Sequence, residues 1–361
     1  MSKIDSLTIQ GFKSIRSLDK LQLNNLNVLI GANGVGKSNF VSYFRMLHEL
    51  VEGRLQVWTS KQGGADRVLS FGIKETSCFS STLFFGRNGY HVALEPTTNE
   101  GFTFVSEKVH FKGDSVTTSP ELGSGHMESL LKEHTKPISK FCYSSISSWK
   151  VFHFHDTSET AAVKRAGAAH DNEYLRSDAS NLAAYLFKLQ RENSEVYAQI
   201  CKTVRLAVPF FDDFVLKPIQ LASGEEQIRL LWKQADSDYP LWPSQLSDGS
   251  IRFICLVTAL LQPNPPSTII IDEPELGLHP YAITLLGALL RSASKRMQVI
   301  VSTQSVPLLN EFELDDLIVV EREEGASTFK RLDADKFRTW LDDYSVGELW
   351  EKNIIGGRPS K

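Results

Sequence analysis

The stretch of sequence that decides the fold is Gly31-Ala32-Asn33-Gly34-Val35-Gly36-Lys37-Ser38. It fits the pattern G-x-x-x-x-G-K-[S/T], which arises by chance in roughly one chain of this length in a hundred. The apolar run 26–30 before it predicts a buried strand, and apolar residues at helical spacing over 37–50 predict a helix. A glycine-rich turn between a strand and a helix directs backbone N–H groups inward, so the octet predicts a phosphate-binding loop.

The polar side chains of this loop have distinct expected roles. Lys37 would place a positive charge at the β- and γ-phosphates of ATP, and the Ser38 hydroxyl would bind Mg²⁺. The sequence therefore predicts ATP and Mg²⁺ as cofactors. The nucleotide-binding residues expected in this segment are Gly31, Ala32, Asn33, Gly34, Val35, Gly36, Lys37, Ser38 and Asn39.

A second motif, Thr268–Glu273, is an apolar run that ends in two carboxylates. Such a run is typical of a Walker B strand, in which Asp272 would hold Mg²⁺ and Glu273 would polarise the attacking water. The alternative is a strand end followed by a helix-capping Asp-Glu pair. The octet upstream makes this alternative the less favoured interpretation.

A third motif, Leu246–Ser250, stands just before a predicted helix. Taken alone, Ser247 is only a good helix N-cap. Because the motif lies between the two Walker elements in the sequence, we interpret Ser247 and Gly249 as a further phosphate-binding pair.

Two segments far apart in the sequence predict one α/β domain. Strands and helices alternate with short links both near the start and over 246–320, which favours a largely parallel, covered sheet. We therefore assign 1–52 and 241–361 to an ATPase head and 53–240 to an inserted arm of mixed α and β structure. In the arm, the pattern predicts a hairpin over 78–94 and one amphipathic helix over 182–204. No heptad pattern persists, which argues against a long coiled coil.

The three motifs resemble those of the ATP-binding heads in the SMC/RecF branch of ABC-type ATPases. The residues that carry this resemblance are Asn33-Gly34, Leu246–Ser250 and the run 272–280, Asp-Glu-Pro-Glu-Leu-Gly-Leu-His-Pro. The chain as a whole resembles the stand-alone bacterial "predicted ATPase" proteins (AAA family, RecF-like), with Phe12–Ile15 as a further mark. The resemblance implies an α/β fold, namely an ABC-type P-loop head, and an enzyme that hydrolyses ATP.

The resemblance also implies a homodimer that forms head to head on ATP. Ser247 and Gly249 would then contact the γ-phosphate held by Lys37 of the second copy, and residues 275–279 would form a D-loop between the copies. Lys13 or Ser14 would touch the nucleotide. The chain departs from the family pattern at Gln304, where a histidine usually senses the γ-phosphate. An amide carries no charge at neutral pH, so we expect Gln304 to take part in slow hydrolysis.

Composition limits the partners. The net charge is −4, so contact with double-stranded DNA would need a local basic patch. The candidates, among them Lys164, Arg165 and Arg176, are interspersed with acidic residues, which favours a solvated mixed face. Two functions stay open: an ATPase of DNA repair or of defence against foreign DNA with a partner nuclease, and a nucleotide-switched scaffold that controls an effector protein without binding DNA.

The remaining predictions concern location and metal binding. The N-terminal residues lack the apolar segment of a signal peptide, and 262–266 interrupt the longest uncharged stretch with three prolines. We therefore expect a cytoplasmic protein that does not enter a membrane. His153 and His155 would share one face of a strand, but without further ligands a packed structural role is favoured over a metal site.

Overall fold

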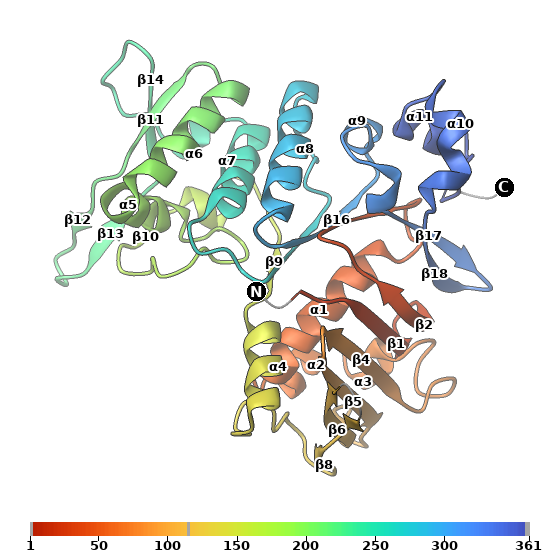
Figure 1. The fold of residues 1–361 in the computed structure, drawn as a ribbon. Coiled ribbons are helices and arrows are strands. Elements are labelled where there is room, and N and C mark those ends of the chain that lie inside the picture. Colours follow the sequence, from red (N-terminus) through yellow and green to blue (C-terminus); the bar gives the residue numbers. More distant parts are fainter. Residues whose placement is uncertain (1–2, 114–115, 358–361) are drawn as a thin grey trace.

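The computed structural model describes residues 3–113 and 116–357 of the chain (Figure 1). Its central element is a six-stranded sheet that contains both Walker strands. All of its neighbouring strands pair in parallel except the first two, which are antiparallel. In order, the strands are β18 (Ala326–Arg331), β17 (Leu317–Glu323), β3 (Leu26–Ile30), β16 (Gln298–Thr303), β15 (Thr268–Asp272) and β9 (Lys150–Phe152).

A seven-stranded antiparallel sheet lies against one face of the head. Its strands are β2 (Ile15–Gln22), β1 (Ser6–Phe12), β4 (Phe79–Phe85), β5 (Asn88–Pro96), β6 (Phe102–Lys112), β7 (Thr117–Thr118) and β8 (Glu121–Gly123). The predicted hairpin is confirmed as β4 and β5. Because β4 pairs with β1, the boundary placed between 52 and 53 does not coincide with a boundary between sheets.

Two hydrophobic cores lie on opposite faces of the central sheet. Alternate residues of one strand belong to different cores: Val28 and Ile30 to one, and Leu29 to the other. Helix α1 (Lys37–Val51) belongs to the second core, together with the antiparallel sheet. A strand buried on both faces needs apolar side chains on both, which Leu26, Val28, Leu29 and Ile30 supply. The buried Asn27 is the polar exception, and its amide donates to Asn24 O and Val299 O.

Helices cover the other face of the central sheet (Figure 1). Helix α8 (Pro280–Ser294) packs on β16 and β3, and α7 (Asp248–Leu261) packs beside α8. Helix α6 (Ser194–Ala207) packs on α7 and α8, and α5 (Leu182–Glu192) packs on α6. The prediction of one helix over 182–204 is wrong. Asn193, at φ −141° and ψ 57°, interrupts it, so α5 and α6 are separate helices. The apolar stripe continues past Asn193 because both helices face the same core.

The remaining elements are short. The helices are α2 (Leu55–Lys61), α3 (Ala65–Val68), α4 (Pro137–Ser147), α9 (Val306–Leu309), α10 (Arg338–Leu341) and α11 (Val346–Glu351). Two small sheets are formed by β10 (Gly167–Ala168), β13 (Glu226–Ile228) and β12 (Ile219–Gln220), and by β11 (Phe211–Val215) and β14 (Leu231–Gln234). Within the described ranges, the helices are too short or too polar to cross a bilayer.

Candidate functional site

The carboxyl ends of three neighbouring strands bring the predicted site residues together. In the register of the sheet, Asp272 lies opposite Ser302, and Thr303 lies opposite Ile30. Gly31, Gln304 and Glu273 therefore follow directly at one edge, where β3, β16 and β15 end. Ligands of parallel α/β sheets bind at this edge because loops and helix N-termini converge there.

The predicted phosphate-binding loop leaves its backbone donors without partners in the described structure. Between β3 and α1, the amide N–H groups of residues 33–38 donate no hydrogen bond within the described part of the chain. Gly34 and Gly36 have positive φ values, 79° and 111°, which turn these groups to one side. An array of N–H groups at a helix N-terminus attracts anions.

Gly36 cannot carry a side chain. A Cβ atom there would collide with the hydroxyl oxygens of Ser327 and Ser14. The Ser327 hydroxyl donates to Val35 O at 2.5 Å, and its oxygen lies 2.6 Å from Ser14 Oγ. The Ser327 N–H donates to Ser14 O at 2.7 Å. Ser14, in the turn after β1, and Ser327, at the start of β18, therefore stabilise the conformation of the loop 31–38.

Lys37 is folded onto its own loop. Its ammonium group donates to Gly31 O at 2.7 Å and to Ala32 O at 2.9 Å, and the residue is 5% exposed. Burial lowers the pKa of Lys37 below its ordinary value, while the carboxylates of Glu273, Asp272 and Glu275 act in the opposite direction. The lysine thus faces the acidic end of β15.

The neighbours of Lys37 differ in their surroundings. Ser38 is exposed in the first turn of α1. The side-chain amide of Asn39 donates to Ser14 Oγ at 2.7 Å and so stabilises the turn that contains Ser14. Lys13, next to this turn, donates to Ser42 Oγ at 2.8 Å and to Gln62 Oε1 at 3.1 Å. Contact of Lys13 or Ser14 with a nucleotide stays a prediction.

Asp272 and Glu273 are held by the neighbouring strand. The Ser302 hydroxyl donates to Asp272 Oδ1, and the Glu273 N–H donates to Ser302 O at 2.9 Å. Gln304 Nε2 donates to Glu273 Oε1 at 2.6 Å. Glu273 has a φ of 44°, in the left-handed region, which is costly for a residue with a side chain and clusters at functional sites.

Glu275 is a further carboxylate at this edge, which the sequence analysis placed only in the D-loop. It is 8% exposed, and its Oε1 accepts from Thr303 Oγ1 at 2.5 Å and from Gln304 N at 3.2 Å. Its Oε2 is buried without a hydrogen-bond partner in the described structure, and burial raises the pKa of Glu275.

The predicted signature residues lie at the start of α7. Ser247 caps this helix, since its Oγ accepts from Ser250 N at 3.1 Å. A Cβ on Gly249 would collide with Gly277 O, so the helix start packs directly on the predicted D-loop. Within the described ranges, neither Ser247 nor Gly249 forms a hydrogen bond to residues 31–38.

Comparison with known proteins identifies the family. Residues 26–310, more than half of the chain, match the family described as "AAA domain, putative AbiEii toxin, Type IV TA system". The chain belongs to this AAA-domain family. No curated protein is significantly similar to it in sequence.

Solved structures show the same fold. An Smc head bound to the C-winged helix domain of ScpA is 15% identical, with a TM-score of 0.65, over 93% of this chain and 99% of that one. A second Smc head domain, with an extended coiled coil and bound to the C-terminal domain of ScpA derived from Pyrococcus furiosus, is 14% identical, with a TM-score of 0.58, over 95% and 99%. The predicted ABC-type head fold is therefore confirmed, and the family match supports the predicted resemblance to AAA-type ATPases.

Two further residues border the site: His153, which the sequence analysis weighed only as a metal ligand or a packed structural residue, and Arg45, which it missed. His153 directly follows β9, whose Phe152 pairs with Ile271, so His153 lies beside the end of β15. Arg45 lies on α1, within electrostatic reach of Asp272. Neither stands in a motif. In the described residues, no group of three or more His, Cys, Asp or Glu side chains is placed to hold a metal.

Proposed function

We propose that this AAA-domain protein binds and hydrolyses ATP in the presence of Mg²⁺, and that two copies join around the nucleotide. The observation that carries the proposal is the convergence of Lys37, Asp272 and Glu273 at one sheet edge, with Gln304 bonded to Glu273. A lone glycine-rich turn would not need two carboxylates and an oriented amide at the ends of neighbouring strands.

The donor groups fit ATP and Mg²⁺. The unbonded N–H groups of 33–38 and the ammonium of Lys37 suit the phosphates, and the exposed Ser38 hydroxyl and the Asp272 carboxylate are oxygen ligands of the kind that Mg²⁺ prefers. Bound there, Mg²⁺ would offset the charge of the phosphate oxygens.

Glu273 is the proposed general base. Its Oε1 is engaged by Gln304, which leaves the other carboxylate oxygen to accept a proton from the attacking water. Gln304 orients the carboxylate but cannot take up charge, because an amide is neutral. Because a neutral amide does not stabilise developing charge as a protonated histidine would, we expect ATP turnover to be slow.

A head-to-head dimer would complete the site. Ser247 and Gly249 form no hydrogen bond with the phosphate-binding loop of their own chain in the described ranges, so the proposed contact with the γ-phosphate comes from a second copy. The N-terminus of α7 would then supply further N–H donors.

The proposed context is DNA repair or defence against foreign DNA together with a partner protein such as a nuclease. The contacts of two basic candidates favour the alternative, a switched scaffold for an effector: Lys164 pairs with Asp248 at 3.1 Å, and Arg176 with Asp171 at 2.6 Å. The similar Smc head is itself bound to a protein domain, that of ScpA. The division into a head (1–52 and 241–361) and an arm (53–240) is part of the proposal.

The test is steady-state ATP turnover with and without linear double-stranded DNA, at low and at physiological salt, with Glu273→Gln as the blank. Stimulation that disappears as the salt concentration rises supports direct DNA binding, because contacts with phosphates release counterions. Turnover that is indifferent to DNA supports the scaffold. Absence of ATP turnover above the blank overturns the proposed hydrolysis.

A further inference from the structure

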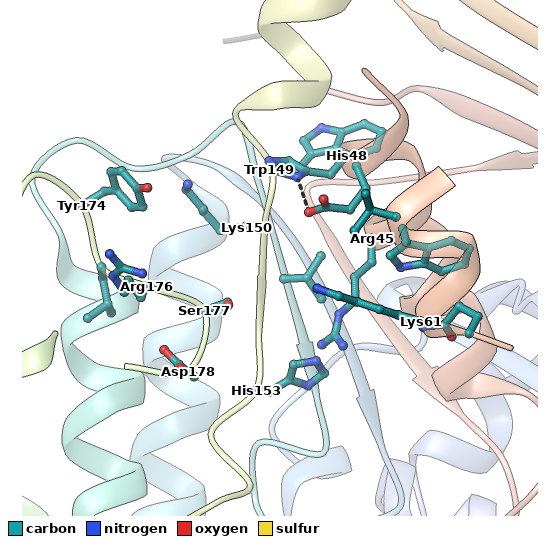
Figure 2. Close-up of a pocket in the computed structure, with 16 residues that line it drawn as sticks. Arg45, His48, Lys61, Trp149, Lys150, His153, Tyr174, Arg176, Ser177 and Asp178 are labelled. Carbon is teal, nitrogen blue, oxygen red and sulfur yellow. Dashed lines mark ion pairs between the residues drawn. The ribbon is translucent and has the colours of Figure 1, made fainter. Parts of the chain in front are cut away.

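A second cavity lies beside the proposed ATP site. It has a volume of about 560 Å³ and is walled by α1 and α2 on one side and by the segment 174–178 on the other (Figure 2). Residues 149–153, which include β9, run between these walls. No residue of the loop 31–38 lines it, so this cavity is not the phosphate-binding loop itself.

The side chains around the cavity carry a surplus of positive charge. Arg45, Lys61, Lys150 and Arg176 line it, against the carboxylates of Glu49 and Asp178. Arg176 is paired with Asp171 at 2.6 Å, so Arg45, Lys61 and Lys150 carry the surplus. Glu49 is already engaged, by Arg54 Nε at 2.6 Å and by His48 at 3.6 Å. These contacts lower the pKa of Glu49 to about 2, and the contact with His48 has the largest effect. The negative charge of Glu49 is therefore already balanced by His48 and Arg54.

Three buried nitrogen atoms in the cavity wall lack a hydrogen-bond partner in the described structure. They are Arg45 Nη2, Trp149 Nε1 and His153 Nε2. Trp149 is 1% exposed, and the arginine and tryptophan nitrogens can only donate. In Figure 2 the side chains of Arg45 and His153 point toward one another across the cavity. Buried donors without partners cost free energy, which an acceptor bound between them would recover.

Two of the positively charged side chains, Lys150 and Arg45, are partly buried. Burial lowers the pKa of Lys150 and lowers that of Arg45 to about 10. The Lys150 ammonium lies 4.3 Å from the centre of the half-exposed Tyr174 ring, and Trp58 lines the opposite wall. An anion offsets buried positive charge, and aromatic rings stack on bases.

We propose that this cavity is a second anion site, which binds the phosphate group of a ligand of about mononucleotide size. The volume lies within the range of small-molecule sites, and the donors are of the kinds that bind phosphate. A free mononucleotide and the 5′-terminal nucleotide of a strand present the same chemistry. Because α1 and β9 also border the ATP site, a ligand here contacts elements that position Lys37 and adjoin Asp272.

The test is isothermal titration calorimetry of the full chain, with saturating Mg-ADP present so that the ATP site is already filled. Binding of Mg-ADP to the ATP site is measured in a separate titration. The probes are thymidine, thymidine 5′-monophosphate and a short 5′-phosphorylated oligothymidylate. We expect the two phosphorylated probes to bind and thymidine not to bind. Tighter binding of the oligonucleotide identifies a strand end, and equal binding identifies a free mononucleotide.

Variants locate the probe. Arg45→Gln should weaken binding of the monophosphate by at least about tenfold, and Lys61→Gln, at an exposed position, by about threefold. Arg191→Gln removes an exposed arginine outside the cavity and should leave binding unchanged. Circular dichroism checks folding, and Lys61→Gln keeps the test valid where Arg45→Gln does not fold. Equal binding by wild type and Lys61→Gln, or no binding by wild type at millimolar probe, overturns the proposal.

Discussion

Gln304 Nε2 lies 2.6 Å from Glu273 Oε1, and this hydrogen bond joins the ends of two neighbouring parallel strands. It fixes one oxygen of the carboxylate that stands next to Asp272 and within electrostatic reach of Lys37. The amide occupies the position at which the resembling ATPases usually carry a histidine. Orientation of Glu273, rather than sensing of charge, is therefore the role that we propose for Gln304.

Removal of this hydrogen bond should slow ATP turnover. In Gln304→Ala, the carboxylate loses a charge-assisted hydrogen bond, and we expect kcat to fall about 10- to 100-fold. The KM for ATP should change little, because the phosphates are held by the loop 31–38. Gln220→Ala, at an exposed position, is the control. Unchanged kcat in Gln304→Ala would show that the hydrogen bond plays no part in turnover.

Gly36 should tolerate no side chain. Gly36→Ala forces a Cβ against Ser327 and Ser14, so we expect the free energy of unfolding to fall by about 2–4 kcal/mol and nucleotide affinity to fall with it. Gly53→Ala is matched, because φ is 69° there and its Cβ would meet nothing within 4 Å. Strain alone should cost about 1–2 kcal/mol in the control. Chemical denaturation measures the free energy of unfolding of both variants. An equal loss of stability in Gly36→Ala and Gly53→Ala would contradict the predicted steric clash at Gly36.

Much of the fold follows from local sequence signals. The runs 26–30 and 268–272 are mainly apolar, as strands covered on both faces are, with Asn27, Thr268 and Asp272 as their polar members. Strands β4 and β5 are marked by glycines between alternating residues. The pairing of β1 with β4 joins residues more than 60 positions apart, and no local pattern encodes it. The break at Asn193 was missed because one apolar stripe serves both helices.

The site was predictable where a motif specifies it and not where tertiary register does. Lys37 and Asp272 belong to sequence motifs. Glu275, in contrast, reaches the Thr303 hydroxyl only because β15 pairs with β16. Arg45 occupies a polar position on an amphipathic helix, which usually faces water. Its burial depends on β9 and the segment 174–178, which lie more than 100 residues away.

Glu275 should make stability depend on pH. Its pKa is raised in the folded state, so the native protein holds this proton more tightly than the unfolded chain above the ordinary value of 4.5. The contribution of Glu275 to stability is therefore present at lower pH and is lost as pH rises through the raised pKa. We expect Glu275→Gln to gain stability relative to wild type over this window.

The measurement is the free energy of unfolding of wild type and Glu275→Gln between pH 4.5 and pH 8. The difference between them should grow with pH and then level off. Glu225→Gln, at an exposed position, is the control. A difference for Glu275→Gln that stays constant would contradict the raised pKa.

Ser247 tests the proposed contact between copies. Ser247→Arg should bind ATP with wild-type affinity yet stay monomeric, because the bulky cation would occupy the space of the second copy's phosphate-binding loop. Loss of the N-cap alone costs about 1 kcal/mol, and Ser345→Arg, at the cap of α11, reproduces that cost elsewhere. Light scattering with ATP separates monomer from dimer. A normal dimer from Ser247→Arg would remove the proposed contact.

The most direct test of the central claim is the combined ATP turnover and oligomeric state of Glu273→Gln. The side chain keeps its size but cannot accept a proton, so turnover should fall at least about 100-fold while ATP binding persists. The account predicts that this variant accumulates as an ATP-bound dimer, whereas Glu225→Gln behaves as wild type. Wild-type turnover by Glu273→Gln would contradict the assignment of Glu273 as the general base.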